Sequence, residues 1–472
     1  MSNKKELKHK ECERRQFIKQ VVGASGLFAA SLVSSRLAAN SDSLHFLDTK
    51  DCEFTGLPSN FTYLNSGTEG SMPRCVIDKL SSEQHRWSSD PTTSYETDKV
   101  LGKHQHQGRA QVAKALSVNK DNICFTDNTT MAMNMVLMGL NFQATDKVIL
   151  TNHEHNAIVS PLTVQQQRSG ITLIERKFPT ADKLSKMNAQ ELIEALFPNS
   201  KALRGAKALC VSHVYPTTGI RLPLNLLRKK VDELGIQYLI VDGAQAFGMI
   251  DLSRGADAIT NADFYGCPGH KWLNGPPSTG ILYIKNEKIR PPEFFPIMSQ
   301  RMTKYVSGQK LKPSNFPMAE ALQVRGCSNA PGFVAMQTAI DFQTKLGGFS
   351  LVEKNIIKKS NKVKSFIHSN SSLSLVSPLQ DERVQSGLTV FFPFSWNQPN
   401  KIYSDKKIAD KVVSQLLQKN IQIRSIGFDN TEQTNGGRSK KVYALRVSTA
   451  IFNTEKQLEY FFQSLQETLK NL

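Results

Sequence analysis

The seven cysteines of this 472-residue chain include no C-x-x-C pair. They stand at positions 12, 52, 75, 124, 210, 267 and 327, without the spacing that zinc ligands show. We therefore expect no bound metal. Disulfide bonds stay open at this stage, because spacing alone does not assign cysteine partners.

The chain also lacks a basic helix, a basic stripe interleaved with aromatic residues and an internal repeat. Nucleic acid is therefore not expected as a partner, although the formal net charge is +18. This positive charge suits an acidic substrate or an anionic cofactor. With 39% hydrophobic and 21% charged residues, the composition is that of a globular protein with ample core.

An apolar run near the N-terminus, from Val21 to Val33, is too short to span a bilayer. It follows Arg14 and Arg15 and precedes small residues at 34–39. This pattern resembles a twin-arginine export signal. We therefore expect residues 1–39 to be a signal peptide read by the twin-arginine translocase, and the protein to be periplasmic. The alternative is a disordered basic tail or a solvated helix.

The rest of the chain divides by its hydrophobic pattern. Residues 40–60 are expected to be a linker or N-terminal arm. Strand-like runs alternate with helical patterns from 61 to 345, which predicts an α/β domain with a mostly parallel sheet covered by helices. Residues 346–472 change character and predict a smaller C-terminal α+β domain, joined by the N-terminal arm.

A lysine and an acid in the first of these domains suggest one kind of chemistry. Lys271 lies in Gly-His-Lys-Trp-Leu, and Asp242 ends the apolar run Tyr-Leu-Ile-Val-Asp. Pyridoxal phosphate needs an amine that holds its aldehyde as a Schiff base and a carboxylate that keeps its pyridine nitrogen protonated. Both residues follow or flank strands, so they can meet at the carboxyl edge of a parallel sheet.

Two further strand ends carry polar residues. Asn128, Thr129 and Thr130 lie between a strand and a helix, where hydroxyl and N–H groups form a phosphate cradle. His155 follows the next strand, where an imidazole can stack on the cofactor ring. Taken singly, these residues are as readily a helix cap and a polar loop residue.

The chain resembles class V aminotransferases, in the branch around isopenicillin N epimerase and the cysteine desulfurases. The resemblance covers about residues 61–465. It rests on matching stretches in the right order, at 63–68, 127–130, 154–156, 212–214, 241–245, 269–273, 445–448 and 452–454.

The resemblance implies fold type I, pyridoxal 5'-phosphate as cofactor and a role for each matching side chain. Catalytic roles fall to Lys271 as Schiff-base lysine and acid/base, to Asp242 and to His155. Cofactor contacts fall to Lys271, Asp242, Gln245, His155, Asn128, Thr129, Thr130, His270 and Ser328. Substrate contacts fall to Arg446, as the clamp on the α-carboxylate, and to Asn65 and Gly67.

The sequence departs from the family pattern in three places. Pro268 replaces a phosphate-binding serine. Cys327 stands where relatives have a threonine that reaches the neighbouring subunit's phosphate, and Ser328, next to it, is the residue that could substitute. The stretch 215–218 replaces an Asn-rich loop. No cysteine lies beyond 327, although desulfurases need one on a loop of the C-terminal domain, so the usual persulfide reaction is disfavoured.

The resemblance leaves several activities open. An epimerase or aminotransferase acting at Cα of an amino acid or peptide ranks first. An exported enzyme that tailors a siderophore-like peptide, by oxidative decarboxylation or transamination, ranks second. A C–S lyase and a non-catalytic scaffold are the remaining alternatives. A homodimer is expected from the family.

Overall fold

The computed structural model describes residues 53–54, 56–90, 100–285, 293–295, 322, 328–396, 406–431 and 441–470. The expected signal peptide, most of the linker and most of the stretch 287–320 lie outside these residues. Within them, no helix is both long and apolar enough to cross a membrane.

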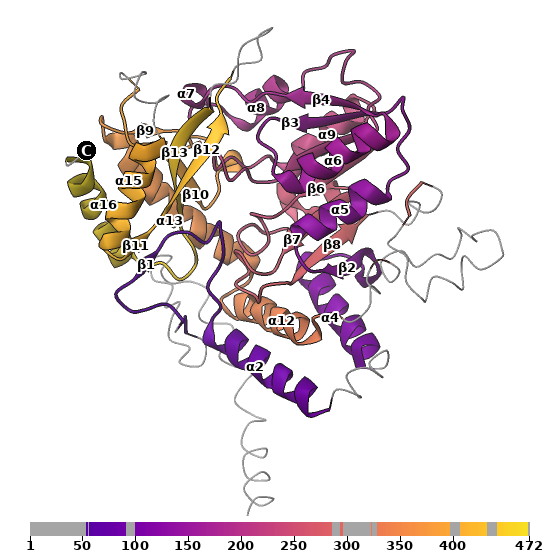
Figure 1. The fold of residues 1–472 in the computed structure, drawn as a ribbon, viewed down its shortest axis with the longest axis horizontal. Coiled ribbons are helices and arrows are strands. Elements are labelled where there is room, and N and C mark those ends of the chain that lie inside the picture. Colours follow the sequence, from indigo (N-terminus) through magenta and orange to yellow (C-terminus); the bar gives the residue numbers. More distant parts are fainter. Residues whose placement is uncertain are drawn as a thin grey trace, which may run out of the picture. The chain divides into compact units, whose positions relative to one another are not determined.

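A seven-stranded sheet forms the centre of the larger part (Figure 1). Its spatial order is β2-β8-β7-β6-β5-β3-β4, and β8 alone runs antiparallel to its neighbours. The strands are β2 (Ile123–Thr126), β3 (Lys147–Thr151), β4 (Thr172–Arg176), β5 (Ala208–Ser212), β6 (Tyr238–Asp242), β7 (Phe264–Pro268) and β8 (Gly280–Ile284). The predicted fold class, an α/β fold with a mostly parallel sheet, is confirmed.

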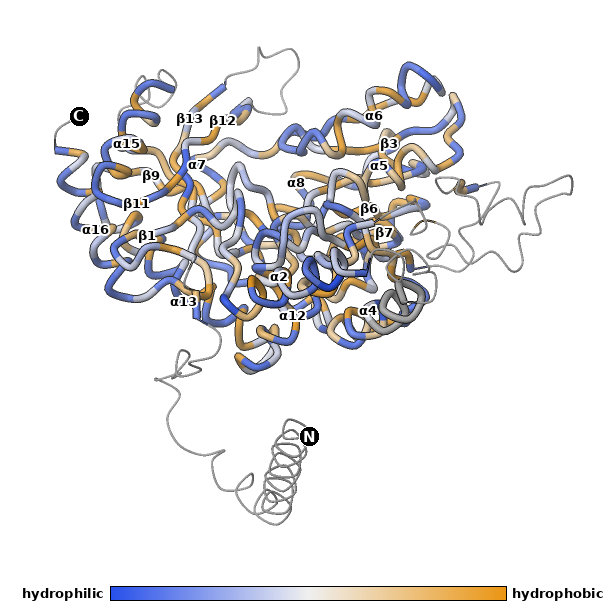
Figure 2. Tube along the Cα trace, turned by 60° about the horizontal axis from the view of Figure 1, so that its bottom comes forward, coloured by the Kyte–Doolittle hydropathy of each residue, from blue (hydrophilic) through white to orange (hydrophobic). Residues whose placement is uncertain are grey.

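The central strands are buried along their whole length, which explains their continuous apolar sequences. Every residue of β5, β6, β7 and β8 is buried, whereas the edge strand β4 is largely accessible. Strands covered on both faces lose the alternation of polar and apolar residues. Figure 2 shows the hydrophobic colouring along β3, β6 and β7.

Helices α5 (Thr129–Gly139) and α6 (Asn156–Ser169) pack together and share one core with inward residues of the sheet, among them Cys210, Ile240 and Leu282. Helix α9 (Leu224–Glu233) packs on β6. Short helices α7 (Ala181–Leu184) and α8 (Ala189–Leu196) follow β4.

Helices from the N-terminal and C-terminal ends of the larger part form a layer that the sequence pattern did not predict. Helix α12 (Ala330–Lys345) packs on α2 (Arg74–Ser89) and on α4 (Val100–Leu116), and α4 contacts β2. Single-turn 3-10 helices complete the described elements: η2 (Lys120–Asn122), η3 (Gly255–Asp257), η4 (Ile259–Asn261) and η7 (Glu382–Val384).

The C-terminal part contains a four-stranded antiparallel sheet of order β12-β13-β10-β9. Its strands and helices are β9 (Ser374–Leu375), β10 (Leu388–Phe392), β12 (Arg424–Asp429), β13 (Lys441–Ser448), α13 (Phe349–Ser369), α15 (Lys406–Gln418) and α16 (Glu455–Lys470). Leu445 and Val447 of β13 enter a core with all three helices. Because side chains alternate along a strand, Arg446 between them faces the opposite side of the sheet.

The N-terminal strand belongs with this smaller sheet. β1 (Thr62–Tyr63) pairs in parallel with β11 (Ile421–Gln422), and Leu64 joins the small-domain core. The predicted boundary placed residues from 61 onward in the large domain, so residues 62–64 depart from it. The cause is local: the backbone groups of a two-residue strand are satisfied by the nearest open strand edge.

Buried polar contacts hold the smaller part against the larger one. Arg221, which is 7% exposed, donates to the backbone oxygens of Glu382 and Arg383 and pairs with Glu353 at 2.6 Å. His153 Nε2 lies 2.8 Å from the carbonyl oxygen of Asp429. These contacts fix which edge of the large sheet faces Arg446.

The described cysteines fall into two groups. Cys124, Cys210 and Cys267 are free thiols buried in strands, whereas Cys75 is disulfide-bonded. No group of three His, Cys, Asp or Glu side chains among the described residues could hold a metal ion.

At Gly248, the loop after β6 packs closely on the loop that carries Lys271, and a substitution there tests this contact. Its φ is +90°, and an added Cβ would lie 2.3 Å from the backbone nitrogen of Leu273. We expect Gly248→Ala to lower the free energy of unfolding by about 3 kcal/mol more than Gly235→Ala. Gly235 shares the positive φ, at +63°, but has open space around it. Equal losses in chemical denaturation would contradict this packing.

Candidate active site

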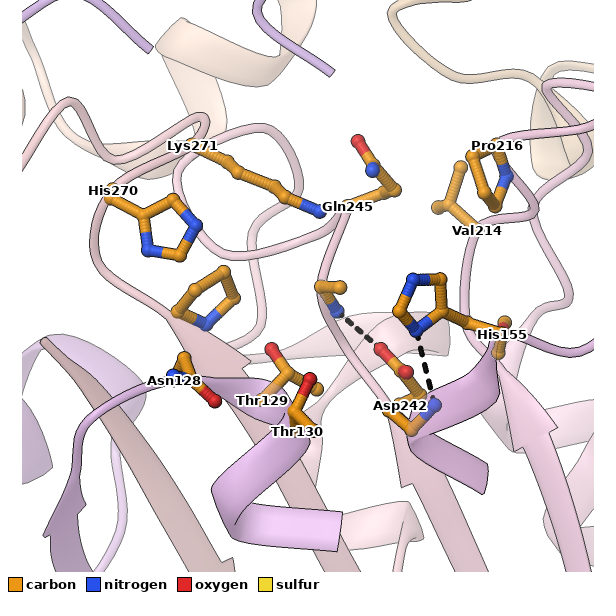
Figure 3. Close-up of a pocket in the computed structure, with 14 residues that line it drawn as sticks. Asn128, Thr129, Thr130, His155, Val214, Pro216, Asp242, Gln245, His270 and Lys271 are labelled. Carbon is orange, nitrogen blue, oxygen red and sulfur yellow. Dashed lines mark hydrogen bonds between the residues drawn. The ribbon is translucent and has the colours of Figure 1, made fainter. Parts of the chain in front are cut away.

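Five strand ends and the segments after them enclose one cavity at the carboxyl edge of the large sheet (Figure 3). Its volume is about 250 Å³. The lining residues are Asn128, Thr129, Thr130, His155, Ala157, Ser212, Val214, Pro216, Asp242, Ala244, Gln245, Pro268, His270 and Lys271. The topology explains the convergence, because β2, β3, β5, β6 and β7 all lead into this edge.

Asp242, at the end of β6, forms the floor of the cavity and is 2% exposed. Its Oδ1 accepts a hydrogen bond of 2.8 Å from the backbone N–H of Ala244. Its Oδ2 is buried and has no hydrogen-bond partner among the described residues. Burial raises the pKa of this carboxyl, although the N–H of Ala244 and the charges of Lys271 and His155 oppose the shift. A cationic N–H donor in the cavity would satisfy the free oxygen.

Lys271 enters the cavity from the opposite wall, and its amine points toward Gln245 (Figure 3). Burial is the main cause that lowers its pKa to about 8, and Arg446 and Arg424 lower it further, while Asp242 acts against them. A larger fraction of the amine is therefore neutral near physiological pH than for an exposed lysine. A neutral amine is the form that attacks a carbonyl carbon.

Polar groups at the start of α5 suit a phosphate. Asn128 caps the helix by accepting from the N–H of Met131 at 2.9 Å. The hydroxyl of Thr129 and the Nδ1 of His270 are buried and lack partners among the described residues. First-turn N–H groups and the helix dipole add to this anion site.

His155 and Gln245 are held in place by hydrogen bonds. His155 Nδ1 accepts from the N–H of Ala157 at 3.1 Å, which places the ring over the cavity beside Asp242. Gln245 Oε1 accepts from the indole of Trp272 at 2.8 Å, and its Nε2 donates to the carbonyl oxygen of Gly67.

The expected substrate contacts lie beside the cavity rather than in its wall. Arg446 Nη2 donates to Asn65 Oδ1 at 3.2 Å and to Thr68 Oγ1 at 2.8 Å. Gly67 is closely enclosed, since an added Cβ would lie 2.9 Å from side-chain atoms of both Leu388 and Ser448. The segment then reaches the lysine loop, because the N–H of Gly70 donates to the carbonyl oxygen of His270.

Ser328 is expected to reach the phosphate site of a second subunit, and a single chain does not test that contact. It does not line this cavity, and its buried hydroxyl has no partner among the described residues. The preceding stretch 323–327 lies outside the described residues.

A buried acid beneath the cavity was missed by the sequence analysis. Glu154 accepts hydrogen bonds from the hydroxyls of Thr151, Ser212 and Tyr215 at 2.6–2.7 Å. Burial raises the pKa of Glu154 to about 7. Ser212 pairs with Asp242 in the sheet, so this cage stiffens the floor of the cavity. The hydroxyl cage around Glu154 is visible only once the strands are paired, because Thr151 and Ser212 are far apart in sequence.

The family model for class-V aminotransferases matches residues 62–461. The chain belongs to the class-V aminotransferase family. One relative is a probable cysteine desulfurase of Pyrococcus abyssi, 26% identical over 284 residues, which is 59% of this chain but only 63% of the relative. Another is isopenicillin N epimerase of Streptomyces clavuligerus, 25% identical over 60% of this chain and 69% of that protein.

Solved structures share the fold. A C-DES variant with glycine covalently linked to the PLP cofactor superposes with a TM-score of 0.69, at 22% identity, over 88% of this chain and 98% of the other. A complex of the cystine C–S lyase C-DES with cysteine persulfide gives a TM-score of 0.68 at 23% identity, over 88% and 99%.

Pyridoxal 5'-phosphate is the cofactor of this family member. The cavity fits it, because the unpartnered atoms match its polar groups. Asp242 would hold the protonated pyridine nitrogen, Thr129 and His270 the phosphate, and Lys271 the aldehyde carbon. Pro268 and Pro216 make the adjoining walls apolar, and neither ring offers a donor.

The lowered pKa of Lys271 gives a test on the cofactor-free protein. Attachment of added cofactor should accelerate as the pH rises and level off above about 8, because the neutral amine reacts. Stopped-flow absorbance of the lysine-bound cofactor measures this rate. A midpoint near the ordinary lysine value of 10.5 would show that burial does not tune this amine.

Proposed function

We propose that this family member acts at Cα of an amino acid, or of an amino-acid moiety, as an epimerase or aminotransferase. The observation that carries the proposal is the juxtaposition of three charges: a tuned amine at Lys271, a buried carboxylate at Asp242 and a buried cation at Arg446. The cofactor, when bound, would accept the electron pair of a broken Cα bond.

Each residue would have a separate role, which its position in the site determines. Arg446 would bind the substrate carboxylate through its planar guanidinium and so orient Cα over the cavity. Lys271 would remove a proton at Cα and return it. Asp242 would keep the pyridine nitrogen protonated, and His155 would hold the ring flat.

A persulfide-forming reaction is less well supported. Three described cysteines are buried in strands and a fourth is disulfide-bonded, and the sequence has no cysteine after position 327. A C–S lyase that uses no cysteine nucleophile, and a non-catalytic scaffold, are the other outcomes that the following experiment would reveal.

Proton exchange at Cα tests the activity. In D₂O the holoprotein should exchange the Cα hydrogen of its substrate, detected by mass spectrometry over a panel of amino acids and amine-bearing peptides. Lys271→Ala should abolish exchange, and Lys201→Ala, at an exposed lysine, should leave it unchanged. Release of sulfide from cysteine, or of cysteine persulfide from cystine, would favour the C–S lyase. A protein that binds no cofactor would favour the scaffold.

We further propose that the protein is a homodimer exported to the periplasm, where an exported enzyme for siderophore-like peptides would act. The disulfide at Cys75 supports an oxidising compartment. The homodimer is proposed from the family resemblance, in which residues near 326–329 reach the neighbouring subunit. Light scattering measures the subunit number.

Export depends on Arg14 and Arg15 under this proposal. The double substitution Arg14→Lys/Arg15→Lys should hold the protein in the cytoplasm, because the translocase reads the arginine pair. Lys4→Gln/Lys5→Gln serves as the control, since it removes nearby charge but keeps the pair. Cell fractionation with immunoblotting gives the answer, and normal export of the first variant would end this proposal.

A further inference from the structure

A second arginine stands directly opposite Arg446 on the neighbouring strand. Arg424 of β12 is its partner in the register of the antiparallel pair. Residues paired in this way point to the same face of a sheet, so both guanidinium groups leave the small-domain core on the same side. That side carries the segment Asn65–Thr68, whose bridge to Ser448 fixes it there.

The two arginines converge on one hydroxyl. Arg424 Nη1 donates to Thr68 Oγ1 at 3.0 Å, and Arg446 Nη2 donates to the same atom at 2.8 Å. Thr68 in turn donates to Asn65 Oδ1 at 2.8 Å. Two full positive charges are therefore separated by a single neutral oxygen.

No carboxylate of the described residues forms an ion pair with either arginine, and the Nε of the 3%-exposed Arg446 has no hydrogen-bond partner there. Burial and then the charge of Arg424 lower the pKa of Arg446 to about 9. Like charges opposite each other in a sheet are destabilising. The two arginines therefore form a site that is suited to binding an anion.

The charges of the two arginines also act on the amine of Lys271. Arg446 and Arg424 both lower the pKa of Lys271, whereas the acid that acts on it from this side is the exposed Glu69. One substrate carboxylate would neutralise one of the two arginines. The second would keep its charge beside the cavity entrance.

We infer that the substrate carries two anionic groups: an α-carboxylate bound by Arg446 and an acidic side chain bound by Arg424. The substrate class is an acidic amino acid, or a peptide that ends in one. This inference rests on the proposed function and deepens it. Arg424 is exposed, which suits a longer, distal group, whereas the buried Arg446 suits the carboxylate next to Cα.

The first measurement is binding to the holoprotein by calorimetry, which needs no turnover. Glutarate should bind at least about tenfold more tightly than butyrate, because a second charge-assisted contact forms. Arg424→Gln should remove this preference, since Gln keeps a donor for Thr68 but loses the charge. Arg424→Lys should retain part of it.

Lys441→Gln is the matched control, because it removes a cation from the same hairpin at the far end of the paired strands. It should leave the preference for glutarate unchanged. Equal affinities for glutarate and butyrate, or an unchanged preference in Arg424→Gln, would overturn the inference.

The second measurement separates this inference from the proposed function. Cα exchange should be faster with glutamate than with glutamine, and Arg424→Gln should lower kcat/KM about tenfold more for glutamate than for glutamine. Equal exchange of both amino acids would contradict the inference of an acidic substrate but would leave the proposed function supported. A preference for glutarate without any Cα exchange would support the anion site but contradict the proposed function.

Discussion

The buried carboxylate of Asp242 is the constraint on which the rest of the site depends. A charged group at 2% exposure is costly unless each oxygen has a partner, yet Oδ2 has none among the described residues. The strand places it there, the N–H of Ala244 fixes its orientation, and the Glu154 cage holds the neighbouring strand end rigid. The cofactor supplies the missing donor. Cofactor binding and stability of the floor are therefore coupled in this account.

Under the proposed function, substrate recognition would come from a different layer of the fold. The alternation of β13 sends Leu445 and Val447 into the small-domain core and leaves Arg446 facing the cavity side. Polar contacts from Arg221 and His153 then hold that sheet against the large one. A change in how the two sheets meet would move the cationic groups relative to Lys271. Under the proposed function, the small sheet would set which substrate binds, and the large sheet would set the chemistry.

Much of this could be predicted from sequence, for physical reasons. Fully buried strands have unbroken apolar runs, so the run that ends in Asp242 marked β6, and the site residues Asp242 and Lys271 could be chosen from the sequence. Helix α5 begins at Thr129, inside the stretch 128–130 that was expected to lie between a strand and a helix, because Asn128 caps it. What sequence could not supply is pairing across distance. The Arg424–Arg446 register and the hydroxyl cage around Glu154 exist only once strands are aligned.

The most direct test of the central claim is the protonation state of the pyridine nitrogen in the bound cofactor. Holoprotein prepared with ¹⁵N-labelled pyridoxal phosphate should show, by NMR, a protonated ring nitrogen across the neutral pH range, because Asp242 faces it. Asp242→Asn should bind the cofactor yet show a neutral nitrogen. A protonated nitrogen in both proteins, or a neutral one in the unaltered protein, would contradict the pairing of Asp242 with the ring.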